Sequence, residues 1–292
     1  MSVFVINMQC RNQKFLAAFR HAVLPVIAAL LLTACSQDEE DRFEGMSAER
    51  IFRQAESTFG NGDFVEAAEI YEEVERLYPY SDWSRRGTIM AAYAYGEAGE
   101  YEKSRSAAER FLSSYPGDED AAYAQYLVGM SYFRQLGARG RDQANTTKAL
   151  EGLQLVMEQY PESDYAESAG LKFDLAVNHL ASKEMEVGRY YLKRGNFTAA
   201  INRFQYVVDN YGTTAQVPEA LHRLVEAYLS LGLVGEARET AIVLGHNFGA
   251  SDWYASTHRL FTSRGLKLPE TVDGDEGLLR QFYRRTVKGE WI

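Results

Sequence analysis

The 292-residue chain contains two cysteines, six prolines and three tryptophans, and its 31 basic side chains are outnumbered by 41 acidic ones. No stretch alternates β-branched with polar residues between turn pairs, as strands commonly do. The acidic balance argues against a nucleic acid or an anionic lipid surface as the main partner. Hydrophobic residues make up 46% of the chain, which is enough for a sizeable core. We therefore expect an all-α protein that binds no nucleic acid.

The scarcity of cysteine excludes a disulfide framework and a thiolate zinc site. Cys10 lies in residues 1–34, which hold three basic residues and no acid, and which include an apolar run from Ala22 to Leu32. A membrane-spanning helix needs about 20 apolar residues, so this shorter run is typical of an export signal that is later removed. Met8 is an alternative start, since seven residues precede an otherwise ordinary basic region.

The second cysteine ends the run Leu32-Thr33-Ala34-Cys35, which resembles the lipobox cut by the bacterial lipoprotein signal peptidase. The resemblance implies a diacylglycerol and an N-acyl chain on Cys35 as a membrane anchor, and we expect no other cofactor. The alternative is a cysteine buried in a core helix, which the polar residues directly after Cys35 disfavour. Ser36 in the next position resembles an outer-membrane sorting signal, so we expect the periplasmic face of the outer membrane.

Residues 35–46 are polar and acidic, as is typical of a tether. Beyond them the chain repeats the pattern of tetratricopeptide repeats, in which two antiparallel helices carry small and aromatic residues at fixed positions. Successive repeats start 37 residues apart, except for one interval of 59. The five starts are Ala48, Arg85, Ala122, Ala181 and Pro218.

The third repeat is enlarged by eight residues between Leu136 and Thr147 and by fourteen between Pro161 and Ala181. Ser163 can cap a helix, and Ala166–Lys193 contains no proline. These features predict one unusually long helix from about Asp164 to Arg194, shared by the third and fourth repeats.

A closing helix is expected at Trp253–Arg264, where it would cover the apolar face of the last repeat. The predicted fold class is therefore an all-α tetratricopeptide-repeat solenoid of five helix pairs with a closing C-terminal helix, spanning residues 47–265. Residues 266–292 are expected to form a tail, in which Asp275–Lys288 has apolar residues at helical spacing.

The chain contains none of these common catalytic motifs: the metalloprotease, serine-hydrolase, P-loop and dinucleotide-binding motifs. The four histidines outside the export signal do not have metal-ligand spacing. Acidic clusters such as Glu72, Glu73 and Glu75 are more typical of a solvated helix face than of paired catalytic carboxylates. We expect no catalytic residue, no metal site and no enzymatic activity.

A protein-binding groove is better supported than a catalytic site. In tetratricopeptide solenoids the first helix of each pair lines the concave side. In repeats one to three, the positions of this helix that would face the concave side hold apolar or aromatic residues. Such a groove suits an extended or helical peptide, although the same side chains could only pack between neighbouring repeats. The candidates are Phe52, Phe59, Ile89, Tyr93, Tyr123, Tyr126, Met130 and Phe133.

Three arginines, Arg134, Arg139 and Arg141, flank or occupy the long loop of the third repeat. Guanidinium groups bind carboxylates with two parallel hydrogen bonds, so these arginines could hold the carboxylate of a bound peptide. The alternative is a solvated loop with ordinary surface arginines.

Several runs are shared with one family. They are the lipobox, Tyr78-Pro79-Tyr80-Ser81, Glu158–Ser163 and, most specifically, Lys183–Gly195 (KEMEVGRYYLKRG) continued by Ala199–Phe204. On these runs residues Ser47–Leu260 resemble the BamD family, the outer-membrane lipoproteins with five tetratricopeptide repeats in the β-barrel assembly machinery.

The resemblance implies that the carboxy-terminal repeats bind the barrel protein BamA, within a complex that has other assembly members. It also implies that the amino-terminal repeats meet the carboxy-terminal signal of unfolded outer-membrane proteins. Arg203, which follows Asn202, falls where the family has a BamA-facing arginine. Arg194 lies one turn before the hairpin of this matched run. The tail after Gly265 departs from shorter family members, so no role is carried over to it.

Two other classes of protein remain as alternatives. Another envelope lipoprotein with these repeats, coordinating peptidoglycan or cell-division machinery, would share the lipobox but not the run at Lys183–Gly195. A lytic transglycosylase would need a separate catalytic domain, and the 27 residues after residue 265 are too few for one.

Overall fold

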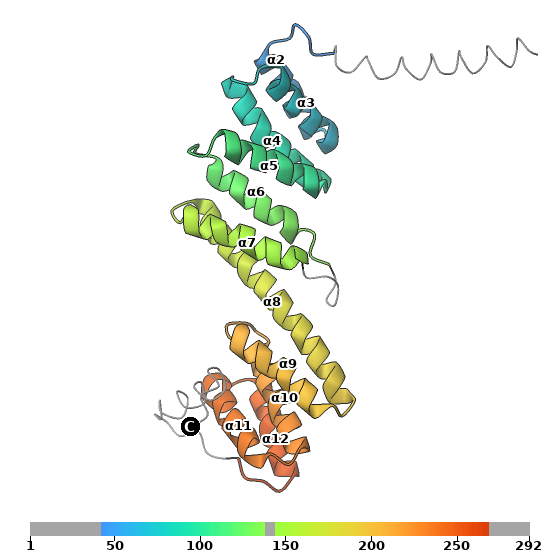
Figure 1. Ribbon diagram of the computed structural model, residues 1–292, viewed down its shortest axis with the longest axis vertical. Helices are drawn as coiled ribbons and strands as arrows, with labels where there is room; N and C mark the ends of the chain where they lie inside the picture. The colour runs from blue at the N-terminus through green and yellow to red at the C-terminus, as the bar shows by residue number, and fades with distance from the viewer. Residues whose placement is uncertain (1–41, 138–143, 269–292) are drawn as a thin grey trace, which may run out of the picture. The chain divides into compact units, whose positions relative to one another are not determined.

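The computed structural model describes residues 42–137 and 144–268, which form eleven α-helices and no strand (Figure 1). Cys35, most of the tether and the helix expected at Asp275–Lys288 lie outside these residues. The helices are α2 (Ala48–Gly60), α3 (Phe64–Leu77), α4 (Asp82–Ala98), α5 (Tyr101–Ser114), α6 (Ala121–Phe133), α7 (Ala144–Gln159), α8 (Asp164–Lys193), α9 (Phe197–Asn210), α10 (Val217–Ser230), α11 (Val234–Phe248) and α12 (Asp252–Ser263).

The helices follow one another in pairs, as the repeat pattern predicts: α2 with α3, α4 with α5, α6 with α7, α8 with α9, and α10 with α11. Short turns join every pair except α6 and α7, which are separated by the longer segment that the sequence predicts in the third repeat. The last helix, α12, packs on α10 and α11. The all-α tetratricopeptide-repeat fold with five helix pairs and a closing helix is therefore confirmed. Within the described chain, none of the helices is both long enough and apolar enough to cross a bilayer.

The chain divides into two compact units, and the boundary between Gly87 and Thr88 lies inside α4. In the first unit, α2 and α3 bury an aromatic pair, since the rings of Phe52 and Tyr71 meet edge to face with centroids 5.1 Å apart. The guanidinium of Arg86 lies 5.1 Å from the Phe52 ring. An aromatic core with a stacked cation thus holds the first repeat together.

In the second unit, small residues allow the paired helices to approach closely. A Cβ atom added to Gly152 on α7 would lie 2.8 Å from the Cα of Gly129 on α6. A Cβ added to Gly188 on α8 would lie 2.4 Å from Cε1 of Phe204 on α9, and Ala200 beside it is fully buried. Only glycine fits at these two contacts without a shift of the neighbouring helix, so the predicted repeat register holds for these two pairs.

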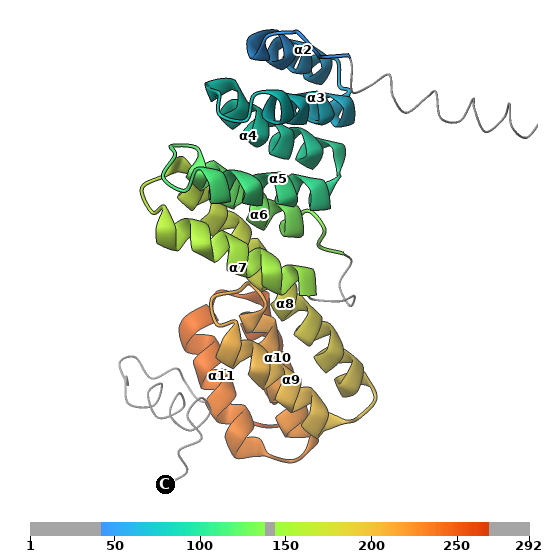
Figure 2. The ribbon, with the colours of Figure 1, turned by 45° about the horizontal axis from the view of Figure 1, so that its top comes forward.

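Helix α8 confirms the long helix expected from the sequence, ending one residue earlier than predicted. It packs on α7 and then on α9, so that a single helix serves two successive repeats (Figures 1 and 2). The chain between α6 and α7 includes residues 138–143, which lie outside the described residues.

The closing helix is joined to the last repeat by a buried polar contact. His222 on α10 is 7% exposed, and its Nδ1 lies 2.8 Å from Oγ1 of Thr257 on α12. The ring of Trp253 covers it at a centroid distance of 5.4 Å. Burial, followed by the neighbouring Arg223, lowers the pKa of His222 from 6.5.

We predict that His222 makes the stability of the closing helix pH-dependent. The unfolded chain takes up a proton on this histidine near its ordinary pKa of about 6.5, whereas the folded chain resists it, so stability falls as pH decreases below about 6.5. Urea unfolding of the Ser36–Ile292 fragment tests this prediction. The measurements run from about pH 5 to about pH 8, which is about one and a half units on either side of the ordinary histidine pKa. His222→Gln should flatten the profile, and substitution of the exposed His258 should not; identical profiles for all three proteins would contradict the prediction.

Candidate functional site

Two of the eight groove candidates are buried in the repeats. Phe52 is 2% exposed among Tyr71, Trp83 and Arg86, and Ile89 is 5% exposed in a core with Phe111. These two side chains stabilise the repeats and cannot contact a peptide, which corrects the expectation for them. The other six candidates are partly exposed.

Phe59 and Phe133 are partly exposed but lie against neighbours of their own repeats. The ring of Phe59 packs on Phe64 with centroids 5.0 Å apart, across the turn between α2 and α3. Phe133 packs against the core of α7 and α8, and the ammonium of Lys172 lies 5.7 Å from its ring centroid. The remaining four candidates lie together around one hollow, and they are Tyr93, Tyr123, Tyr126 and Met130.

A row of tyrosines runs across three successive first helices, from α4 through α6 to α8. The rings of Tyr93 and Tyr123 have centroids 6.4 Å apart, and Tyr165 stacks on Tyr123 at 4.9 Å. Tyr126 lies 5.7 Å from Tyr165. We call these four residues the tyrosine row; it offers aromatic faces at the spacing of the helices that carry them.

Sequence reasoning missed Tyr165, because the repeat register placed the fourth start at Ala181 and left Tyr165 in the inserted stretch. A signal was present in a recurring pattern. Pro-x-Ser-Asp-aromatic occurs at Pro79–Trp83 and again at Pro161–Tyr165, each time at the start of a first helix. The second occurrence marks the start of α8 as a counterpart of the start of α4.

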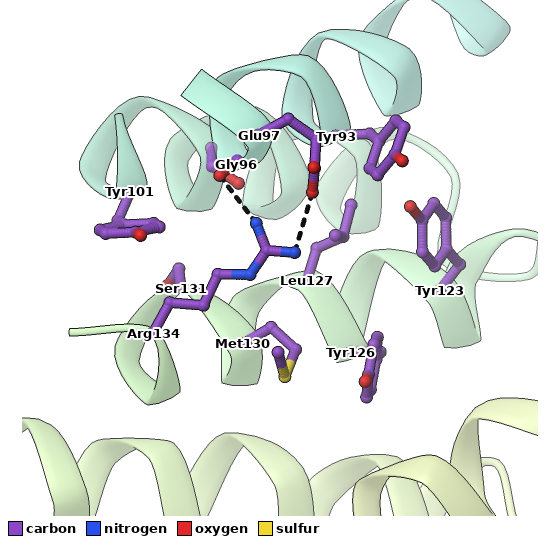
Figure 3. Close-up of a pocket in the computed structure, with 11 residues that line it drawn as sticks. Tyr93, Gly96, Glu97, Tyr101, Tyr123, Tyr126, Leu127, Met130, Ser131 and Arg134 are labelled. Atoms are coloured by element: carbon purple, nitrogen blue, oxygen red, sulfur yellow. Dashed lines mark hydrogen bonds and ion pairs between the residues drawn. The ribbon is translucent and has the colours of Figure 1, made fainter. Parts of the chain in front are cut away.

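Beside the tyrosine row lies a hollow of about 120 Å³ between α4, α5 and α6 (Figure 3). Arg134, which directly follows α6, reaches across it. Its Nη1 donates to the carbonyl oxygen of Gly96 at 2.8 Å, and its Nη2 donates to Oε1 of Glu97 at the same distance. The other lining residues are Tyr93, Tyr101, Ser104, Tyr123, Tyr126, Leu127, Met130 and Ser131.

The hollow therefore combines aromatic and thioether surface with one guanidinium. Burial is the main cause that raises the pKa values of Tyr123, Tyr126 and Tyr165 above their ordinary value. Like an ordinary phenol, each is therefore neutral near pH 7 and can donate a hydrogen bond. Arg134 is 39% exposed at its side chain and is held by Glu97, which itself is reachable by solvent. Arg139 and Arg141 lie outside the described residues.

The carboxy-terminal candidates lie near the turn between α8 and α9. Arg203 on α9 is 46% exposed at its side chain, and its Nη1 lies 2.9 Å from Oε2 of Glu184 on α8. Asn202 is exposed beside it, and the guanidinium of Arg194 lies 4.9 Å from the ring centroid of Tyr190. All three predicted side chains thus reach the surface, and two of them are held by neighbours on α8.

Nothing in the described ranges groups three or more histidine, cysteine or acidic side chains in a way that could hold a metal ion. His222 is a buried, hydrogen-bonded core residue, whereas His246 and His258 are exposed on separate helices. The arrangement instead leaves aromatic and charged side chains partly exposed at the two sets of candidate residues.

Residues 44–243 match the YfiO family, described as an outer membrane lipoprotein family. The outer membrane protein assembly factor BamD of Caulobacter vibrioides is 43% identical over 225 residues, which cover 77% of this chain and 74% of the relative. BamD of Rickettsia prowazekii is 34% identical over 235 residues, which cover 80% and 94%.

Solved tetratricopeptide-repeat structures are more distant. The TPR2AB domain of yeast Sti1, solved in complex with pHSP90, is 14% identical with a TM-score of 0.39, over 75% of this chain and 85% of that one. The family match and the two relatives establish the relationship: the chain belongs to the BamD family of outer membrane protein assembly factors.

Proposed function

We propose that the protein is a non-enzymatic scaffold, anchored by lipid on Cys35 to the periplasmic face of the outer membrane. Its carboxy-terminal repeats bind BamA, and its amino-terminal repeats bind unfolded outer-membrane proteins before their insertion. The family supports a role in outer-membrane protein assembly, since its relatives are named assembly factors. The lipobox supports the anchor, and no cofactor besides the acyl chains is proposed.

The tyrosine row is the observation that carries the substrate half of the proposal. Aromatic side chains that are partly exposed on the first helices of successive pairs give an extended peptide repeated contacts, each with large area and few rotatable bonds. Arg134 can bind a carboxylate beside the row, because its guanidinium has five N–H donors and the bonds to Gly96 and Glu97 do not use all of them. The suited ligand is an aromatic-containing peptide with a free carboxylate.

We predict that Tyr126→Ala weakens binding of a peptide taken from the last strand of an outer-membrane barrel protein. Loss of a central aromatic contact costs about 1–2 kcal/mol, or roughly a five- to thirty-fold weaker affinity. Fluorescence anisotropy with the Ser36–Ile292 fragment measures it. Tyr80→Ala is the matched control, since Tyr80 is fully exposed in the loop before α4.

Arg134→Gln should remove any preference for the peptide with a free carboxylate over its amidated form. If Tyr126→Ala and Tyr80→Ala bound the peptide equally well, the tyrosine row would not be the substrate site.

Lipidation is predicted at Cys35, because small residues and an apolar run precede it. Mass spectrometry of the mature amino terminus should show cleavage before Cys35 and the added mass of the acyl chains. Cys35→Ser should accumulate as an uncleaved precursor. An unmodified Cys35 in the membrane fraction would contradict the anchor while leaving the binding surfaces untouched.

A further inference from the structure

The first described residues fold back along α3. Phe43 is 4% exposed, the hydroxyl of Tyr78 donates to the carbonyl oxygen of Met46, and Nη1 of Arg42 lies 3.3 Å from Oε1 of Glu66. Tyr78 directly follows α3, whereas Glu66 belongs to its first turn. The chain therefore enters the fold at the end of α3 that carries the turn from α2.

That turn exposes apolar side chains. Phe59 and Phe64 are partly exposed on either side of it, and Val65 is 40% exposed. We call these three residues the first-hairpin tip. The residues at the place of Val65 in α5, α9 and α11 are also exposed but are polar or lack a side chain: Glu102, Thr198 and Gly235.

The tip lies within reach of the proposed anchor. Arg42 stands seven positions after Cys35, and a fully extended chain of seven steps spans at most about 25 Å. An acyl group on Cys35 thus keeps the first-hairpin tip close to the bilayer surface. At that distance, apolar side chains at an exposed turn can enter the headgroup region.

The charges around the first-hairpin tip indicate which phospholipid headgroup it can approach. Glu66 is paired with Arg42, but Glu56 and Asp63 are exposed nearby, and residues 38–41 of the tether are all acidic. Negative charges are repelled by anionic headgroups within about 10 Å at 0.1 M salt. A zwitterionic phospholipid surface fits this end of the repeat.

We propose that the first-hairpin tip inserts into the headgroup region of a zwitterionic bilayer beside the lipid anchor, as a second attachment of the first repeat to the membrane. The proposal rests on lipidation of Cys35. Two attachments restrain the orientation of the first repeat, which a tether alone leaves free.

The test uses the lipidated mature protein in phosphatidylcholine vesicles, with an environment-sensitive NBD label on Val65→Cys. The sulfur of lipidated Cys35 is alkylated, so the introduced thiol is the single labelling site. Labels on Tyr80→Cys and Leu233→Cys are the controls: Tyr80 lies beyond the opposite end of α3, and Leu233 is 39% exposed in the last hairpin and tests general adsorption of apolar residues.

A label that enters the headgroup region by about 5–10 Å should gain roughly two- to three-fold in fluorescence and be quenched by doxyl-labelled lipid. We expect this at residue 65 and not at residues 80 or 233, with a smaller response when phosphatidylglycerol is added. If the protein floated with the vesicles but the label at residue 65 showed no gain in fluorescence, or if residues 65 and 233 showed equal gains, this proposal would be overturned. The lipid anchor would still stand. Loss of flotation would overturn the lipid anchor and the proposal with it.

Discussion

Replacing Gly188 by leucine is expected to lower the free energy of unfolding by about 3 kcal/mol or more, the upper end of overpacking in a dense core. Even the first added carbon would lie 2.4 Å from the Phe204 ring, which is fully buried with Met185, Ala200 and Leu221. The ring cannot rotate away without displacing these neighbours. Ala200→Leu should destabilise the same pair of helices by about 1–3 kcal/mol.

Gly152→Ala tests the same principle where a backbone blocks the new atom. The added Cβ would meet the Cα of Gly129 at 2.8 Å, so α6 and α7 must separate. Gly235→Ala is the matched control: it lies in the first turn of α11, and nothing lies within 4 Å of its added Cβ. Alanine there should be neutral or stabilise by up to about 1 kcal/mol, because it favours the helix.

Thermal and urea unfolding of the Ser36–Ile292 fragment measure all four variants. If Gly188→Leu unfolded at the same urea concentration as Gly235→Ala, the two glycines would be equivalent and the close contact of α8 with α9 would be wrong.

The sequence predicts the helix pairs well because their register depends on side-chain size. Gly129 and Gly188 mark places where helices touch, and no other residue types fit there. The length of α8 was likewise predictable, since no proline interrupts it. Ser163 stands at its N-cap position, but its hydroxyl donates to the carbonyl oxygen of Tyr160 and makes no capping hydrogen bond. Both features depend on local constraints, namely the backbone conformation and the side-chain volume at single positions. A repeat pattern in the sequence shows such constraints directly.

The candidate site was harder to predict, because exposure depends on the neighbouring helix. Phe52, Ile89 and Tyr126 share the fifth position of their repeats, yet the first two are buried and only Tyr126 is partly exposed. The partner of Arg134 was also hidden, since Glu97 lies 37 residues away and the pairing depends on how α4 and α6 approach. Repeat position gives the direction of a side chain, and tertiary packing decides what covers it.

Arg203→Glu is expected to reduce capture of BamA by at least about tenfold, because reversing a charge at a desolvated interface costs several kcal/mol. In the free protein the change removes the contact with Glu184 and leaves two carboxylates facing each other. Because the side chain of Arg203 is 46% exposed, that ion pair itself stabilises the fold little, by at most about 1 kcal/mol. The mutant should therefore fold, and the loss should appear in binding.

Two variants separate an interface role from a general effect of charge. Glu184→Gln keeps the arginine and frees its guanidinium, so capture of BamA should be unchanged or stronger. Arg238→Glu reverses a charge on the exposed face of α11 and should alter capture by less than about twofold, as substitutions on an ordinary surface stay within about 0.5 kcal/mol. Pull-down of BamA with matched amounts of each lipoprotein, alongside circular dichroism, measures binding and folding together. Equal recovery of BamA with folded Arg203→Glu and Arg238→Glu proteins would make Arg203 an ordinary surface arginine, and the partner surface would have to lie elsewhere on the carboxy-terminal repeats.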